Sequence, residues 1–310
     1  MTHTLTSSDG TPISRFAFGT MQFGGRADAR DSAAMFEACI AAGITHFDTA
    51  HVYTGGQSEE ILGQLARGCR ERLIVATKVG YVSAVPKVLQ ADFDQSRQRL
   101  QMDHVDVLYL HRYPPDAALE GVLDCLAEMH QRGLFSYLGL SNFAAWQVMK
   151  TVAMARDRGL TVDILQPMYS LVKRQAEVEI LPMCADQGIA VAPYSPLGGG
   201  LLTGKYQSGG DGRLTQDHRY AARYAPDWMQ AVASGLGEIA RELAVHPATL
   251  AAAWAARHEA GPMPILSARN AEQLLPSLEA VNYDMDDALY ARLTALSPTP
   301  APATDRLEEA

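Results

Sequence analysis

Short apolar segments alternate with amphipathic segments along most of the chain, from near residue 15 to near residue 280. Several of the short segments are apolar without a break, for example residues 73–76 (LIVA) and 107–110 (VLYL). Continuous apolar runs of this length are typical of strands that are covered on both faces of a sheet. The pattern predicts eight strands, at residues 15–19, 43–48, 72–78, 105–111, 136–141, 162–166, 189–194 and 262–266.

Helical patterns occupy the segments between these predicted strands. Residues 117–133 are the clearest case, because apolar residues recur on one helical face and Gly133 stands where a helix usually ends. That face comprises Leu119, Leu123, Leu126 and Met129. Weaker patterns predict helices at residues 31–42, 57–69, 144–157 and 174–187. Strands that alternate with helices indicate the α/β class, and eight of them favour a parallel (β/α)8 barrel, or TIM barrel, over an open sheet.

The boundaries of the predicted barrel follow from composition. We expect a single domain over residues 1–297, without internal repeats. Residues 207–216 (QSGGDGRLTQ) are rich in glycine and polar residues, so we expect a long flexible insertion there. Residues 298–310 are Pro-rich and charged, which indicates a flexible C-terminal tail.

Composition excludes several classes of protein. The chain has 310 residues, 47% apolar and 20% charged, which is ordinary for a soluble globular protein. Its net charge of −9 and lack of a Lys/Arg cluster argue against nucleic-acid and membrane partners. The first ten residues lack a basic segment followed by an apolar one, so we expect no signal peptide, and no apolar run is long enough to span a membrane. Four cysteines without a CxxC pair predict buried, reduced thiols in a cytoplasmic protein: Cys39, Cys69, Cys125 and Cys184.

Ionisable side chains stand at the C-terminal ends of three predicted strands, where barrel enzymes carry their chemistry. These are Asp48, Lys78 and His111, and Tyr53 follows Asp48 on the next loop. Each residue taken alone is compatible with a structural role, such as an ion pair or a buried histidine. Four of them at successive strand ends indicate a catalytic group.

This group suits the protonation of an alkoxide as it forms on a carbonyl carbon. Tyr53 holds a proton at neutral pH, and a neighbouring Lys78 would stabilise the phenolate and lower the pKa of the phenol. Asp48 would keep Lys78 charged, and His111 would orient the polarised oxygen. Because no side chain delivers hydride, we expect a nicotinamide cofactor to supply it.

The nucleotide motifs in the sequence are incomplete. Residues 199–206 (GGLLTGKY) match GxxxxGK, but Tyr206 stands where a P-loop needs Ser or Thr for Mg²⁺. The glycine-rich backbone and Lys205 would still suit a pyrophosphate without metal. No GxGxxG follows the first predicted strand, which argues against an ordinary dinucleotide-binding fold.

Eight segments, taken together and in order, resemble the aldo-keto reductase superfamily, in particular its potassium-channel beta-subunit-like branch, over nearly the whole chain. They are FGTMQFGG (18–25), FDTAHVYTGGQSEEILG (47–63), ATKVG (76–80), LYLH (108–111), GLSNF (139–143), LQPMYS (165–170), YSPLGGGLLTGKY (194–206) and SARNAEQL (267–274). The resemblance implies a (β/α)8 barrel that binds NADPH, or less often NADH, and reduces an aldehyde or ketone to an alcohol.

The resemblance also implies roles for individual residues. Tyr53 would be the general acid, tuned by Lys78 and Asp48, and His111 would orient the carbonyl. The nicotinamide end of the cofactor would contact Ser141, Asn142 and Gln166 through its carboxamide and Tyr194 through its ring. The pyrophosphate would contact Ser195, Leu197 and Lys205, and a ribose would contact Gly19, Thr20 and Met21. The adenosine end would contact Arg269 and Gln273. Without the resemblance, Ser141 and Asn142 would be interpreted as a helix N-cap.

The adenosine end departs from the family pattern. Relatives commonly carry Glu and Asn where this chain has Pro276 and Ser277, and some carry Lys where it has Ser267. Arg269 would suit a 2′-phosphate. The preference for NADPH over NADH therefore stays open.

Two other interpretations remain. A metal-dependent barrel hydrolase would use His46 and Asp48, whose alternate positions on one strand direct both side chains inward, together with Lys78 and His111. We expect no metal site, because the YSPLGGG and SNF segments have no role in such a hydrolase. A non-enzymatic cofactor sensor or regulatory subunit would bind NADPH without turnover. The carbonyl substrate and the oligomeric state are not specified, and candidate pocket residues are Phe23, Tyr81, Arg112 and Tyr113.

Overall fold

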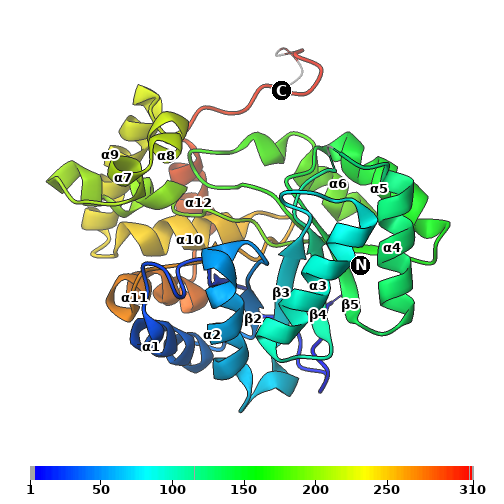
Figure 1. Cartoon of the computed structure of the whole chain (residues 1–310). Coiled ribbons are helices and arrows are strands. Elements are labelled where there is room, and N and C mark those ends of the chain that lie inside the picture. Colours follow the sequence, from blue (N-terminus) through cyan, green and yellow to red (C-terminus); the bar gives the residue numbers. More distant parts are fainter. Residues whose placement is uncertain (1–3, 115, 307, 309–310) are drawn as a thin grey trace.

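Eight parallel strands form the centre of the structure, a computed structural model that describes residues 4–114, 116–306 and 308 (Figure 1). The strands pair in the order β7-β6-β5-β4-β3-β2-β1-β8. Their bounds are β1 Ala17–Gly19, β2 His46–Asp48, β3 Ile74–Val79, β4 Val105–Leu110, β5 Phe135–Ser141, β6 Val162–Gln166, β7 Ala190–Val191 and β8 Ile265–Leu266. All eight lie within or beside the segments predicted from the apolar pattern.

Two backbone hydrogen bonds join the two edges of this sheet. The amide of Met263 donates to the carbonyl of Val191 at 2.7 Å, and the amide of Ile265 donates to the carbonyl of Pro193 at 2.9 Å. We call this junction of β7 and β8 the seam. With the seam joined, the predicted (β/α)8 barrel is confirmed.

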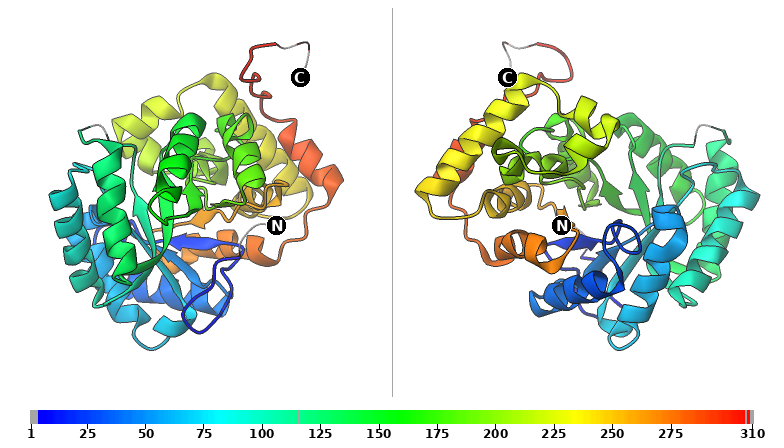
Figure 2. Two further views of the ribbon diagram at one scale, coloured as in Figure 1. Left: turned by 90° about the vertical axis from the view of Figure 1, so that its right-hand side faces the viewer. Right: turned by 60° about the vertical axis from the view of Figure 1, so that its left-hand side comes forward.

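Helices surround the strands, as the two further views show (Figure 2). Their bounds are α1 Ala29–Ala41, α2 Gln57–Ala66, α3 Pro86–Leu100, α4 Leu119–Gln131, α5 Ala145–Arg156, α6 Ile180–Gln187, α7 Arg213–Gln216, α8 His218–Arg223, α9 Asp227–Glu242, α10 Pro247–Arg257, α11 Ala271–Leu278 and α12 Asp287–Thr294. The five predicted helices are present, with ends that shift by a few residues. The largest difference is at residues 174–187, where a short 3-10 turn precedes α6.

Helix α3 was missed because its sequence is mostly polar. Only four of its residues are buried, Leu89, Phe93, Ser96 and Leu100, at the spacing of a single helical stripe. Pro86 stands at its first turn, a position that proline favours. Helix α10 was missed for the opposite reason: it is buried on nearly every side, so no polar face marks its periodicity.

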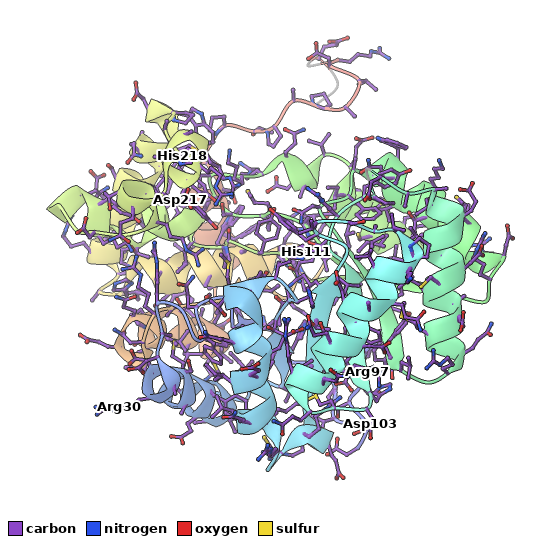
Figure 3. All side chains as sticks on the ribbon, viewed as in Figure 1. Arg30, Arg97, Asp103, His111, Asp217 and His218 are labelled. Atoms are coloured by element: carbon purple, nitrogen blue, oxygen red, sulfur yellow. The ribbon has the colours of Figure 1, made fainter. Side chains whose placement is uncertain are left out.

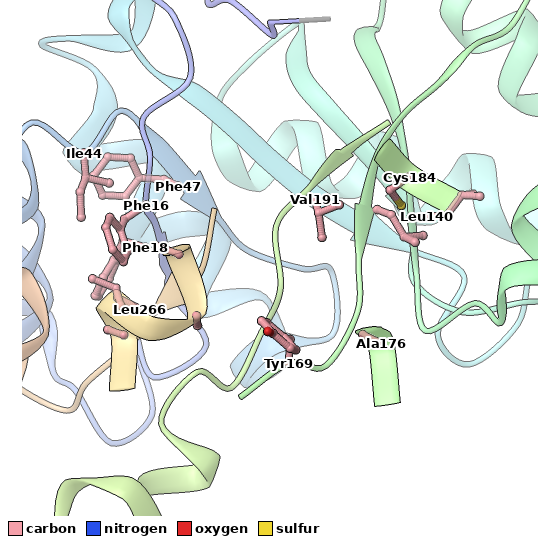
Figure 4. Packing of buried hydrophobic residues seen from close by; sticks show 14 of the residues in the cluster. Phe16, Phe18, Ile44, Phe47, Leu140, Tyr169, Ala176, Cys184, Val191 and Leu266 are labelled. Carbon is pink, nitrogen blue, oxygen red and sulfur yellow. The ribbon is translucent and has the colours of Figure 1, made fainter. Parts of the chain in front are cut away.

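The apolar core has two parts. The larger part lies between the strands and the helices, where Figure 4 shows Phe16, Phe18 and Phe47 gathered near Leu266. The smaller part contains inward-facing strand residues and the N-terminal segment: Leu5, Ala17, Ile74, Ala76, Val107, Tyr109, Ile164, Ala192, Met263 and Ile265. The amide of Thr6 donates to the hydroxyl of Tyr137 at 3.1 Å, so the N-terminal segment is tied to β5 below this smaller core.

The expected insertion contains ordered turns of helix. Residues 207–216 run from a 3-10 turn into α7, which is followed directly by α8 and α9 on the same side of the barrel (Figure 1). Residues 298–306 are mostly exposed and run away from the barrel in each view (Figures 1 and 2). The division into a barrel over 1–297 and a flexible tail over 298–310 stays a prediction, and residues 1–3, 115, 307, 309 and 310 lie outside the described chain.

All four cysteines are free thiols, but only Cys39 and Cys184 are buried. Cys69 and Cys125 are partly exposed, since Cys69 follows the end of α2 and Cys125 lies at the side of α4. Among the described residues, no helix has both the length and the apolarity needed to cross a membrane.

His46 is the most unusual residue inside the barrel. Its side chain is fully buried, and neither ring nitrogen has a hydrogen-bond partner in the described part of the chain. Burial lowers the pKa of His46 from its ordinary 6.5 to about 4, and the nearby Asp48 only partly opposes this shift. The imidazole is therefore neutral in the folded protein at neutral pH.

We expect the substitution His46→Leu to make the protein less sensitive to acid. Because the unfolded chain binds a proton at His46 at a higher pH than the folded chain, stability falls as the pH drops from 6.5 towards about 4. Removing the imidazole should shrink the loss of unfolding free energy between pH 7 and pH 5 by about 2 kcal/mol. Urea denaturation at both pH values measures this, with the exposed His218→Leu as control; an unchanged pH dependence in His46→Leu would contradict it.

Candidate active site

Lys78 lies at the centre of the candidate site. Strand β3 directs its side chain into the barrel, where it is fully buried. Its ammonium group donates to Asp48 Oδ2 at 2.5 Å and to the carbonyl of Thr49 at 2.8 Å, and it reaches Tyr53 Oη at 3.4 Å. The structure therefore brings together three of the four predicted catalytic residues around one cation.

Asp48 uses both carboxylate oxygens. Oδ2 accepts from Lys78, and Oδ1 accepts from the side-chain amide of Gln166 at 2.9 Å. Burial alone would lower the pKa of Lys78, but the charge of Asp48, with Tyr53, outweighs burial and raises it. Lys78 therefore stays an ammonium ion inside the barrel.

Tyr53 is partly exposed on the loop after β2, and its pKa is raised. Burial is the largest cause, and the opposing charge of Lys78 is not enough to reverse it. From the sequence, we expect Lys78 to bring the pKa of Tyr53 below its ordinary value. In this structure that expectation is wrong, because it left out desolvation by the barrel wall. The phenol keeps its proton at neutral pH and is a donor.

The backbone just after Tyr53 is strained. Thr54, Gly55 and Gly56 all have positive φ, at 48°, 66° and 100°. A threonine in this region costs about 1–3 kcal/mol, so surrounding contacts must hold it. The Thr54 hydroxyl donates to the carbonyl of Phe23 at 2.8 Å, and it accepts from the amide of Ser58 at 3.0 Å. These bonds help to fix the direction in which Tyr53 leaves the backbone.

His111 follows β4 and faces the same site. Its ring lies 6.1 Å from the Tyr53 ring, edge to face, and 4.8 Å from the ring of Tyr81. Burial, followed by the charges of Lys78 and Arg112, lowers the pKa of His111 to about 3. The imidazole is therefore neutral and can donate only one N–H at a time. Figure 3 shows His111 well separated from Arg97 and Asp103, which lie towards the lower edge of that view.

The three predicted carboxamide contacts lie side by side at the ends of β5 and β6. The Ser141 hydroxyl donates to the carbonyl of Gln166 at 3.1 Å, and the Asn142 amide group donates to Ser141 Oγ at 3.1 Å and to the carbonyl of His111 at 3.0 Å. The Tyr194 hydroxyl donates to Asn142 Oδ1 at 2.8 Å. Helix α5 has Ala144 as its N-cap, so the N-cap interpretation of Ser141 and Asn142 is wrong.

The predicted ribose contacts lie at the end of β1. Gly19 has no room for a side chain, because a Cβ there would lie 2.8 Å from Ile265 Cγ2. Thr20 is fully buried, and its hydroxyl interacts with Ser58 Oγ at 2.8 Å and with the carbonyl of Asp48 at 3.2 Å. Met21 is 40% exposed and is the only one of the three with a largely accessible side chain. Thr20 therefore braces the loop that carries Tyr53 and offers little side-chain surface to a ligand.

A turn of positive-φ residues follows β7. Ser195 has φ 62°, and Gly198, Gly199 and Gly200 have φ 57°, 65° and 96°. Ser195 and the neighbouring Leu197 are partly exposed, as the predicted pyrophosphate contacts must be. Backbone N–H groups in such turns form concave sites for anions.

Four cationic side chains gather beyond this turn. The pKa of Lys205 is lowered, first by burial and then by the charges of Arg269, Arg213 and Arg26. Arg269 donates to Gln216 Oε1 at 3.2 Å. Like charges repel one another, so their convergence favours an anionic ligand that would relieve this repulsion.

The predicted adenosine contacts are only partly brought together. Arg269 is partly exposed near the cationic group, whereas Gln273 is exposed in the first turn of α11. Ser277 is buried against the barrel, and the carbonyl of Pro276 accepts from Thr249 Oγ1 at 2.6 Å. Of these two departures from the family pattern, Ser277 therefore packs inside, whereas Pro276 is partly exposed. Ser267 Oγ is buried without a hydrogen-bond partner among the described residues.

Three of the four candidate pocket residues lie in the loops after β3 and β4, and each makes a ring contact there. Arg112 lies over the ring of Tyr81 at 5.0 Å, and Tyr113 contacts Phe143 and Trp146 with ring centroids 5.4 Å and 5.8 Å away. The fourth, Phe23, is fully buried and packs 5.7 Å from the Phe18 ring. It is a core residue, because the turn that contains it folds back onto β1.

Several residues around the site were missed. Tyr109 lies beside Lys78 inside the barrel and is fully buried, and its alternation with His111 along β4 was a usable signal of its inward direction. The contact from Gln166 to Asp48 crosses 118 positions of sequence and left no local signal. Arg26 belongs to the cationic group but lies just outside the FGTMQFGG segment (18–25), so it was not considered as a ligand contact.

The metal-dependent interpretation loses support from these contacts. Both oxygens of Asp48 already accept hydrogen bonds, Oδ2 from Lys78 and Oδ1 from Gln166, and the neighbouring charge of Lys78 opposes a second cation there. In the described part of the chain, no group of three or more His, Cys, Asp or Glu side chains could hold a metal ion.

Known proteins resemble this chain along most of its length. Residues 15–298 match the Aldo/keto reductase family. The "Uncharacterized oxidoreductase YrpG" of Bacillus subtilis is 30% identical over 98% of both chains. The "Aflatoxin B1 aldehyde reductase member 4" of Homo sapiens is 40% identical over 61% of this chain and 59% of its own length. The "Probable voltage-gated potassium channel subunit beta" of Oryza sativa is 32% identical over 88% of this chain and 89% of its own. The chain therefore belongs to the aldo/keto reductase family, and this membership supports an oxidoreductase that acts on carbonyl groups.

Proposed function

We propose that this protein reduces an aldehyde or ketone to an alcohol with NADPH, or with NADH, and that Tyr53 is the general acid. The observation that carries the proposal is the contact of one ammonium group, on Lys78, with both the Asp48 carboxylate and the Tyr53 hydroxyl. An ionised partner holds Lys78 charged, and the charged Lys78 stabilises the phenolate that remains when Tyr53 gives up its proton.

Each residue of the group has a defined task in this proposal. The carbonyl oxygen of the substrate accepts hydrogen bonds from Tyr53 Oη and from the neutral imidazole of His111. A bound nicotinamide supplies the hydride that the side chains lack. As negative charge grows on the substrate oxygen, Tyr53 transfers its proton there, and Lys78 stabilises the tyrosinate. Because the pKa of Tyr53 is raised, the proton remains available across the neutral range.

Three features of the chain fit such a cofactor. The convergence of Lys205 with three arginines suits phosphate groups. The buried Ser267 Oγ has no partner among the described residues and suits a ligand oxygen. The adjacent side chains of Ser141, Asn142 and Gln166 supply the donors and acceptors that a carboxamide requires. In this proposal Asn142 exchanges its bond with Tyr194 for a bond to the ligand.

The substrate we propose is a small-molecule carbonyl compound. One relative is named for an aldehyde that it reduces, and the aromatic rings of Tyr81 and Tyr113 in the loops near His111 favour an apolar body next to the carbonyl. We place the enzyme in the cytoplasm, where thiols are kept reduced, in agreement with the four free cysteines.

The central test is cofactor titration followed by turnover. We expect NADPH to bind with a change in its fluorescence and an aldehyde panel to oxidise it at a rate proportional to protein concentration. NADH titrated in parallel measures the cofactor preference. Tight binding without turnover of any aldehyde or ketone would favour an alternative function, that of a cofactor-binding regulatory subunit. The rice relative is named as a subunit of a channel, and this name is the reason to keep the alternative. Absence of binding by either dinucleotide would contradict both.

We expect Tyr53→Phe to lower kcat by at least about a hundred-fold, because the general acid is removed. NADPH affinity should change little, since the phenol contacts the carbonyl rather than the phosphates. Stopped-flow turnover and fluorescence titration of the same preparation separate the two effects. Tyr283→Phe, remote from the site, is the matched control, and near-normal kcat in Tyr53→Phe would exclude it as the acid.

We expect Arg269→Ala to weaken NADPH binding about ten-fold and NADH binding much less, because the lost charge-assisted hydrogen bond would serve the 2′-phosphate. Fluorescence titration with both dinucleotides measures the difference. Arg292→Ala, which removes an exposed arginine paired with Glu242, is the control. Equal losses for NADPH and NADH would mean that another residue contacts the 2′-phosphate.

A further inference from the structure

We propose that Arg99 and Glu59 are positioning residues for Tyr53, because their ion pair, in which Glu59 is fully buried and Arg99 is partly exposed, locks the loop that carries it. The loop comprises residues 49–56 and is called the tyrosine loop below. This inference rests on the proposed function, since it assigns Tyr53 the role of acid. Neither Arg99 nor Glu59 contacts the reacting atoms.

The tyrosine loop is pressed against Arg99. Gly56 has φ 100°, and a Cβ added there would lie 2.4 Å from both Cζ and Nε of Arg99. Only glycine leaves space for the guanidinium and adopts this φ without strain. The end of the tyrosine loop and the side chain from α3 therefore fit together as one packed unit.

Arg99 also binds the tyrosine loop through hydrogen bonds. Its Nη1 donates to the carbonyl of His51 at 3.1 Å and lies 3.3 Å from His51 Nδ1. The His51 ring in turn lies 3.3 Å from Ser96 Oγ and 3.5 Å from Asp92 Oδ1, both on α3. Helix α3 thus holds the loop two residues before Tyr53, and Gly56 is held three residues after it.

Glu59 connects Arg99 to the strand that carries Lys78. Its side chain is fully buried, and Oε2 lies 3.3 Å from Arg99 Nη1. Its Oε1 accepts from Thr77 Oγ1 at 2.6 Å. Thr77 points out of the barrel directly before Lys78 points in, and the amide of His51 donates to the carbonyl of Lys78 at 3.0 Å. The ion pair therefore contacts both the loop that carries Tyr53 and the strand that carries Lys78.

The contact between Lys78 and Tyr53 is sensitive to small shifts of the tyrosine loop. Lys78 Nζ and Tyr53 Oη are 3.4 Å apart, at the long end of hydrogen bonding. A further shift of the tyrosine loop would break this contact, and misplacement of a catalytic group by about 1 Å can cost about a hundred-fold in rate. Burying the Glu59 carboxylate costs solvation energy, so we infer that the value of this ion pair lies in fixing one geometry.

The test compares Arg99→Met with Arg97→Met. Arg97 lies two positions earlier on α3, pairs with Asp94, and is far from His111 in Figure 3. We expect Arg99→Met to lower kcat between about ten-fold and a hundred-fold while KM and the Kd of NADPH change less than about two-fold. Arg97→Met should leave all three unchanged. Glu59→Gln, which keeps the shape and removes the charge, should lower kcat in the same direction, and it serves if Arg99→Met does not fold.

A double-mutant cycle separates positioning from general destabilisation. In the Tyr53→Phe background, Arg99→Met should cause no further loss of kcat, because the acid that it positions is gone. An equal loss in both backgrounds, or an unchanged kcat in Arg99→Met and Glu59→Gln, overturns the proposal.

Hydrogen–deuterium exchange provides a readout that does not depend on turnover. Amides in residues 49–58 should exchange faster in Arg99→Met, or in Glu59→Gln, than in Arg97→Met, with other peptides unchanged. Equal exchange in this segment overturns the proposal. If the wild-type protein reduces no carbonyl compound, the proposed function fails, and the exchange result alone decides whether this ion pair holds the tyrosine loop.

Discussion

The ion pair between Asp48 and Lys78 is the interaction on which the candidate site depends. Two charges inside a barrel are expensive unless their hydrogen bonds are complete. Here the carbonyl of Thr49 accepts a second hydrogen bond from the Lys78 ammonium group. The side-chain amide of Gln166 donates a hydrogen bond to the second oxygen of Asp48. Because these partners come from β6 and from the loop after β2, the ion pair needs the rolled sheet, and a flat sheet of the same order would not complete it.

The same burial explains the division of charge at the site. Lys78 keeps its charge because Asp48 outweighs desolvation, whereas His111, which has a cation for a neighbour, becomes neutral. Tyr53 retains its proton for the related reason that a buried phenolate is disfavoured. The site thus offers one fixed cation and two neutral donors, an arrangement that stabilises negative charge only when it develops on a bound oxygen.

The sequence predicts the strands well, and it also singles out the four residues that come together at the candidate site, because both depend on local patterns. Short apolar segments, several of them continuous, located all eight strands, and their ends located Asp48, Lys78 and His111. Features that depend on distant contacts were not predictable: the polar surface of α3 concealed Arg99, and nothing near Gln166 indicated its bond to Asp48. The upward shift of the Tyr53 pKa was not predicted for the same reason, since desolvation depends on the folded barrel and not on the residues close to Tyr53 in the sequence.

The seam has a consequence for ligand binding. Strands β7 and β8 are two residues long, so only a short ladder of backbone bonds holds these edges together. The loops that leave them carry Tyr194 and Ser195 on one side and Ser267 and Arg269 on the other. Any molecule that contacts both loops bridges the seam, where few backbone hydrogen bonds join the strands. Its binding free energy then also opposes unfolding of the whole barrel.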